Sequence, residues 1–141
     1  MFERRKSRPP QKRIDSLIGA GTVVQGSVMF AGGLRIDGAV DGKVATADNA
    51  PGTLVISEHA RVDGEVKVSH VVINGSVSGP VTANDYLELQ AKARVNGDVV
   101  YRTLEMHVGA IVQGKLIHAE PETASIVELK RASGERMSTT A

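Results

Sequence analysis

The sequence lacks several features on which other classes of protein depend. It contains no cysteine and no tryptophan, and only two phenylalanines and two tyrosines. Without cysteine there is no disulfide scaffold and no thiolate metal site, which fits a reducing compartment. No stretch approaches the roughly 18 apolar residues of a membrane span, and no signal-peptide core follows the N-terminal charges. We therefore expect a soluble, cytoplasmic protein whose core buries small branched side chains in a regular array.

The charges are distributed unevenly along the 141 residues, a length that suits one domain. The net charge is +1, but residues 1–13 alone carry +5 and the remainder carries −4. Residues 1–14 hold too little apolar content to fold, and Pro9 and Pro10 block a helix. We predict a flexible basic tail over residues 1–14.

The start of this tail suggests a membrane partner. Two apolar residues precede a basic cluster, a pairing that suits a weak anchor on an anionic membrane surface, at about 1 kcal/mol per cation. The predicted membrane-binding residues are Met1, Phe2, Arg4, Arg5 and Lys6. An ordinary solvated tail is the alternative, and nucleic acid is not an expected partner.

A short unit of aliphatic, polar, glycine, polar and aliphatic residues recurs along the chain. Residues 60–66, 93–99 and 110–116 are the clearest copies, and weaker copies lie at 23–28, 35–40 and 72–77. Apolar positions alternate with period two from about residue 15 to 118, which predicts strands, and no comparable stretch has helical spacing. The body is therefore expected to be all-β, with its fold decided by the repeat.

The repeat length predicts a solenoid. Leu87 and Leu104 are 17 residues apart, as are Val95 and Val112. Seventeen residues make three short strands with tight corners, which describes a triangular parallel β-helix over residues 15–118, roughly 29 Å long. Allowing one insertion near residues 48–52, six coils begin near Ile18, Leu34, Leu54, Val71, Leu87 and Leu104. Residues 119–141 are predicted to be a second flexible tail.

The glycine of each unit is predicted to form a corner. Glycine tolerates a positive φ and leaves room between stacked coils. The predicted corner glycines are Gly26, Gly38, Gly64, Gly75, Gly97 and Gly114.

No catalytic residue or cofactor is predicted. The carboxylates that could act as in pectin-cleaving β-helices flank the repeat glycine and read first as turn residues; they are Asp37, Asp41, Asp63, Glu65 and Asp98. The four histidines, at positions 59, 70, 107 and 118, have no HxH or HExxH spacing for a metal. Nor does a glycine-rich loop precede a helix, so nucleotide binding is unsupported.

One enzyme remains as an alternative. A left-handed β-helix of the hexapeptide-repeat acyltransferase type would use His70 or His107 as general base. Six-residue spacing does occur, at Ile18, Val24, Phe30 and Ile36. However, the hexapeptide pattern places glycine directly after the aliphatic residue, whereas the usual offset here is two.

The pattern I-G-x-G-T-x-x-x-G at residues 18–26, followed by R-I-D-G-x-x-x-G at 35–42, is similar to that of the bactofilins, bacterial cytoskeletal polymer proteins. Residues 109–114 and the layout of tail, repeat body and tail extend the resemblance over about residues 15–118. The resemblance implies a right-handed β-helix that polymerises end to end without nucleotide, as a membrane scaffold that positions cell-wall or cell-shape proteins. It also implies a membrane-targeting N-terminal stretch. Family members often have phenylalanine in the last coil, at a position that corresponds here to Val112.

Elementary physics also favours self-association. An uncapped solenoid has unpaired backbone groups and an open apolar ladder at each end, which stacking on a second copy would cover. We therefore predict a non-enzymatic polymer scaffold with an interface on the terminal coils, formed by Ile18, Val24, Val108, Ile111, Val112 and Leu116.

Overall fold

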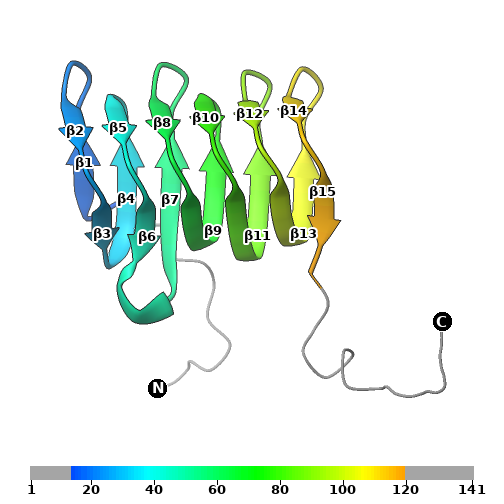
Figure 1. The fold of residues 1–141 in the computed structure, drawn as a ribbon, viewed down its shortest axis with the longest axis horizontal. Coiled ribbons are helices and arrows are strands. Elements are labelled where there is room, and N and C mark those ends of the chain that lie inside the picture. Colours follow the sequence, from blue (N-terminus) through cyan, green and yellow to red (C-terminus); the bar gives the residue numbers. More distant parts are fainter. Residues whose placement is uncertain (1–13, 120–141) are drawn as a thin grey trace, which may run out of the picture.

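The computed structural model describes residues 14–119, which wind into a parallel β-solenoid of six coils (Figure 1). The predicted all-β fold with parallel strands is confirmed, while its handedness stays a prediction. No helix in the described part of the chain is long and apolar enough to cross a membrane.

Each coil contributes three short strand segments. Coil 1 contains β1 (Ser16–Ile18), β2 (Val23–Gln25) and β3 (Val28–Phe30), and coil 2 contains β4 (Gly32–Ile36), β5 (Ala39–Asp41) and β6 (Val44–Thr46). After the 3-10 turn η1 (Ala47–Asn49), coil 3 consists of β7 (Gly52–Ile56), β8 (Arg61–Asp63) and the first half of β9 (Val66–Ile73). Coils 4 to 6 continue through β10 (Ser76–Ser78), β11 (Val81–Leu89), β12 (Arg94–Asn96), β13 (Val99–Met106), β14 (Ile111–Gln113) and β15 (Leu116–His118).

These segments stack into three parallel faces. The first face joins β1, β4 and β7 to the second halves of β9, β11 and β13. The second face is the six-stranded sheet β2-β5-β8-β10-β12-β14. The third face joins β3 and β6 to the first halves of β9, β11 and β13 and then to β15. The strands β9, β11 and β13 therefore run from the third face to the first.

The core consists of vertical ladders of aliphatic side chains, because the same inward position of each coil lies above its equivalent in the coil before. On the second face the ladder runs Val24, Val40, Val62, Val77, Val95 and Val112. Its middle members are at most 2% exposed. Complete burial of an aliphatic side chain contributes about 1.5–3 kcal/mol, so regular stacking replaces the aromatic packing that this chain lacks.

The observed register agrees with five of the six predicted coil starts. Leu34 pairs with Leu54, Leu54 with Val71, Val71 with Leu87 and Leu87 with Leu104. The first start was wrong by two residues, since Ser16 pairs with Leu34 and Ile18 pairs with Ile36. A polar serine occupies this ladder position because the ladder opens to solvent there, so it left no apolar signal.

The insertion between coils 2 and 3 lies at η1, within the region that the sequence indicates. Asp48 adopts a left-handed backbone conformation with φ of 53°. The chain re-enters the sheet at Gly52, whose N–H donates to Ser69 Oγ at 2.9 Å, while this hydroxyl donates back to Gly52 O at 2.9 Å. The buried serine thus satisfies both backbone groups at the re-entry point.

The sequence analysis predicted a single kind of corner glycine, but the structure places these glycines at two different corners of the solenoid. Those between the second and third faces have φ between +125° and +157° and stack directly above one another; they are Gly26, Gly42, Gly64, Gly79, Gly97 and Gly114. Gly42 and Gly79 were missed by the sequence analysis. Gly38 and Gly75 instead form tight turns between the first and second faces, beneath the wider loops of coils 1 and 3 (Figure 1).

Candidate functional site at the two ends

The two ends of the solenoid differ from its middle because their strands pair on one side only. Within the described residues, β2 and β14 are the outer strands of the second face. β1 and β3 occupy the same position at the N-terminal end, and β15 does so at the C-terminal end. Each end therefore presents a row of backbone N–H and C=O groups suited to pairing with another strand.

The apolar ladders are also open at the ends. Leu116 is 44% exposed, whereas Val99, directly beneath it in the same ladder, is fully buried. Met106 is likewise 44% exposed above the fully buried Leu89. At the opposite end Val24 is half-buried and its neighbour Val40 is buried. Both ends thus expose aliphatic surface that a further coil would cover.

The predicted interface residues divide between the two ends. Ile18 and Val24 lie on the outermost strands at the N-terminal end of the solenoid, and Val112 and Leu116 lie on those at the C-terminal end. Val108, 97% exposed, lies in the loop after β13, and Ile111 is the half-exposed first residue of β14. Other apolar residues of the terminal coils escaped sequence reasoning, although the ladder register could have identified them: Leu17, Val23, Val28, Met29, Phe30, Leu104, Met106 and Ile117.

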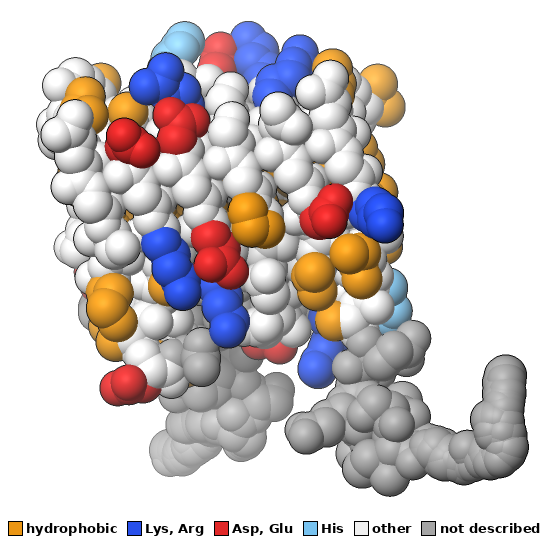
Figure 2. All heavy atoms as spheres, in the orientation of Figure 1, with side chains coloured by type: hydrophobic (Ala, Val, Ile, Leu, Met, Phe, Trp, Pro, Cys, Tyr) orange, Lys and Arg blue, Asp and Glu red, His pale blue; other side chains and the backbone are white. Residues whose placement is uncertain are grey.

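The ends carry little charge. Residues 16–33 contain no Asp, Glu, Lys or Arg, and β14 and β15 contain none either. Figure 2 shows apolar side chains at both ends of the visible face, while most of the charged side chains lie over the coils between them and a few lie near the edges. Lysine and proline commonly protect exposed sheet edges against pairing. The outer strands β1, β2, β3, β14 and β15 contain neither residue.

Among the carboxylates beside the repeat glycines, Asp37, Glu65 and Asp98 make contacts between neighbouring coils. Asp98 Oδ1 accepts a hydrogen bond from the Lys115 N–H at 3.0 Å, one coil further on. Asp37 accepts from the Ser57 hydroxyl and from Arg35 Nε, and the hydrogen bond from Ser57 is the main cause that lowers the pKa of Asp37. Asp41 is paired with Asp63 in the ladder of the second face. Asp63 forms an ion pair with Arg61 at 3.5 Å, and Glu65 forms one with Lys43 at 3.8 Å.

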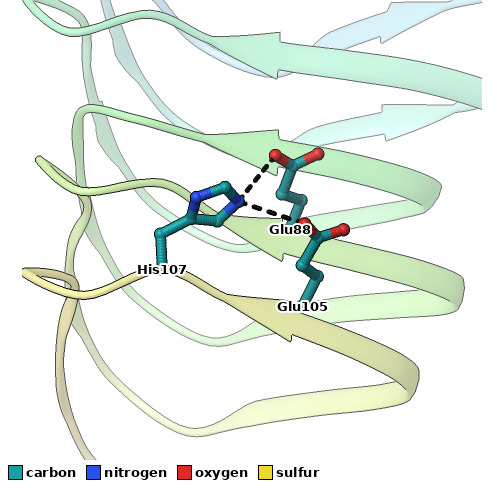
Figure 3. A group of neighbouring side chains, drawn as sticks. All are labelled: Glu88, Glu105 and His107. Atoms are coloured by element: carbon teal, nitrogen blue, oxygen red, sulfur yellow. Dashed lines mark hydrogen bonds and ion pairs between the residues drawn. The ribbon is translucent and has the colours of Figure 1, made fainter.

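A separate cluster lies on the outer side of the first face near the C-terminal end. His107 Nε2 is 3.1 Å from Glu88 Oε2 and 3.3 Å from Glu105 Oε2 (Figure 3). The Tyr86 hydroxyl donates to Glu105, and this hydrogen bond raises the pKa of Tyr86 to about 12. The sequence analysis considered His107 only as a possible general base. It missed the signal for this cluster, which is Glu105-x-His107 with a second glutamate, Glu88, 17 residues before Glu105. His70 lies apart from this cluster, with Nδ1 3.1 Å from Ser69 Oγ.

The predicted membrane-binding residues Met1, Phe2, Arg4, Arg5 and Lys6 lie outside the described residues. So does nearly all of the predicted C-terminal tail, from residue 120 onward.

The fold and its two open ends define a repeat protein of the β-solenoid class. A family model, the bactofilins, described as polymer-forming cytoskeletal proteins, matches residues 16–117. The chain belongs to the bactofilin family, and it is accordingly a structural protein of the polymer-forming cytoskeletal type. It is 28% identical to Bactofilin BacO of Myxococcus xanthus (strain DK1622) over 115 residues, which cover 82% of this chain and 85% of that protein. No solved structure gave a significant match. These findings give the acyltransferase alternative no support.

Proposed function

We propose that the protein assembles end to end through its terminal coils into filaments that need no nucleotide. The observation that carries this proposal is the continuity of the ladders. The first and last coils have the same three-sided arrangement as the interior coils. However, their inward-facing side chains are half-exposed, whereas the equivalent side chains of the interior coils are buried. A second copy placed against an end would continue the stack.

The energetics favour such a contact. Burying an aliphatic side chain contributes about 1.5–3 kcal/mol, and about half of that remains available at each half-exposed rung. Several rungs meet at once, which offsets part of the loss of rotational and translational freedom on association. The backbone groups of the outer strands would pair in the same contact, as they do between neighbouring coils.

The test compares charged variants at the two ends with one in the middle. Val112→Lys and Val24→Lys place a cation in the open rung of either end, and Ser78→Lys places one on the exposed side of β10, in the centre of the second face. We expect the wild-type chain and Ser78→Lys to form filaments without nucleotide in electron microscopy. Val112→Lys and Val24→Lys should sediment as small species with unchanged circular dichroism. Small discrete oligomers of the wild type, or filaments of both end variants, would contradict the proposal.

We further propose that the N-terminal tail attaches these filaments to an anionic membrane surface. The support is compositional, since Met1 and Phe2 are followed at once by Arg4, Arg5 and Lys6. Pelleting with vesicles that contain phosphatidylserine should be strong for the full chain and weak for a chain that begins at Gln11. Val112→Lys separates the contribution of a single tail from that of many tails on one filament, because this variant retains the tail but should not assemble. Equal pelleting of the full and shortened chains would remove this proposal.

The proposed partners are cell-wall or cell-shape proteins positioned by the filament. This role follows from the scaffold function of the family that the sequence resembles, combined with the assembly proposed above. In cells, Val112→Lys should disperse a cell-wall enzyme that the wild-type filament localises, while Ser78→Lys should leave its localisation unchanged. If the enzyme stays localised with unassembled Val112→Lys, the positioning role is wrong.

A further inference from the structure

The cluster of Glu88, Glu105 and His107 joins the last two coils of the solenoid. Glu88 and Glu105 are directly paired across β11 and β13, and His107 follows β13 immediately. Figure 3 shows the two carboxylates projecting side by side, with the imidazole ring turned toward both. The three side chains are 21%, 55% and 42% exposed, so an ion from solvent has access to them.

Two neighbouring carboxylates of this kind favour the binding of a cation. Like charges placed directly opposite each other on adjacent strands are destabilising. Within residues 14–119, the ion pairs found for Glu88 and Glu105 are both with the same atom, His107 Nε2. A neutral imidazole cannot donate one proton to two carboxylates at once, whereas a metal ion can bind one lone pair from each of the three groups.

We propose that Glu88, Glu105 and His107 bind one divalent first-row transition-metal ion of the Zn²⁺ class. Zinc bonds of about 2.0–2.2 Å in a tetrahedral site place ligand atoms roughly 3.3–3.6 Å apart. The nitrogen-to-oxygen distances here are 3.1 Å and 3.3 Å, and the three ligand atoms lie within 4.8 Å of one another. Only a small rearrangement separates the cluster from tetrahedral coordination, with water completing the ligand set.

The composition of the cluster favours a transition metal over Ca²⁺ or Mg²⁺. Those harder cations prefer sets of oxygen ligands, while one imidazole with two carboxylates suits Zn²⁺, Co²⁺ or Mn²⁺. The sequence offered no metal site because no two histidines have metal-binding spacing. The solenoid register instead supplies the third ligand, Glu88, from one coil earlier.

Surrounding hydrogen bonds orient all three ligands. The Tyr86 hydroxyl donates to Glu105 Oε1, and Gln90 Nε2 donates to Glu88 Oε2 at 3.1 Å. The backbone N–H of His107 donates to Leu89 O at 2.9 Å, which fixes the start of its loop against the preceding coil. Such outer contacts hold metal ligands in place and increase affinity.

The bound ion would fasten the terminal coil to its neighbour. Glu88 belongs to coil 5, whereas Glu105 and His107 belong to coil 6, whose outer strands pair on one side only. Binding to the folded state alone stabilises that state by mass action. This proposal does not rest on filament formation, because the site lies within one chain.

The test uses untagged full-length protein with Co²⁺ as a spectroscopic probe and Zn²⁺ as competitor. We expect visible Co²⁺ absorption that saturates at one ion per chain and disappears when Zn²⁺ is added. Glu88→Gln and His107→Asn should each weaken Co²⁺ binding at least tenfold. His59→Asn is the matched control, because His59 interacts electrostatically with Glu58 but belongs to no group of three metal-ligating side chains within residues 14–119, and it should be dispensable.

Hydrogen exchange supplies a second readout that does not depend on colour. Zn²⁺ should slow exchange in β15 and in the second half of β13 for the wild type and for His59→Asn, but not for His107→Asn, and Mg²⁺ should have no effect. If His107→Asn binds Co²⁺ as the wild type does, or if the wild type does not bind Co²⁺ at all, the proposal is overturned.

Discussion

At Gly38 and Gly75 the space for a side chain is already filled by backbone. A Cβ added at Gly75 would lie 2.3 Å from Ser57 O and 2.6 Å from Ala60 O, and one added at Gly38 would lie 2.3 Å from Thr22 O. These carbonyls belong to the wider loop of the preceding coil, under which the tight turn fits. Carbonyl oxygens in a paired backbone cannot rotate aside, so both positions require glycine for reasons of space.

The corresponding prediction compares two alanine substitutions. Gly75→Ala should lower the free energy of unfolding by about 3 kcal/mol, the upper end of the usual cost of overpacking. Gly19→Ala should change it by less than about 0.5 kcal/mol, because an added Cβ there meets nothing within 4 Å. Urea unfolding, carried out in the Val112→Lys background to keep the protein unassembled, measures both. Equal stabilities of the two variants would show that the space at Gly75 is not limiting.

At the scale of elements, strands of three residues are stable here only because they are stacked. Each of β8, β10 and β12 is three residues long and pairs with a strand on both sides. Their equivalents at the ends, β2 and β14, have a single neighbour. Local stability should therefore fall from the centre of the second face toward its two outer strands.

Amide hydrogen exchange can measure this gradient. In a chain carrying both Val24→Lys and Val112→Lys, the amides of β2 and β14 should exchange at least tenfold faster than those of β8 and β10. In wild-type filaments the difference should largely disappear, because the outer strands gain a neighbour. Unchanged exchange in β2 and β14 upon assembly would place the intermolecular contact elsewhere on the molecule.

For the whole molecule, folding and assembly should be coupled. Association favours the folded state by mass action, so the midpoint of thermal unfolding should rise with protein concentration for the wild type and for Ser78→Lys. Val112→Lys should show one midpoint at all concentrations. Calorimetry over a hundredfold concentration range measures the effect, and a wild-type midpoint independent of concentration would argue against filaments under those conditions.

Much of this architecture was predictable because a solenoid repeats its environment. The alternation around Val62 indicated strands, and the 17-residue spacing from Val95 to Val112 gave the ladder that the structure contains. The prediction failed where the environment changes. Ser16 broke the apolar pattern at an open end. Gly42 and Gly79 lie in full copies of the unit, but the similar copies four residues earlier, at Gly38 and Gly75, were chosen as the corners instead. The Glu88 cluster was missed because its members meet through stacking and not through local sequence.

The outer strands β1, β2, β3, β14 and β15, which contain no Asp, Glu, Lys or Arg, also determine how assembly could be controlled. Contacts between apolar surfaces depend little on ionic strength, so changes in salt would not dissolve such a filament. A rod that associates only at its ends has two growing points, whatever its length. Binding proteins that cover both ends could therefore halt growth at about two copies per filament, far below the number of subunits that the filament contains.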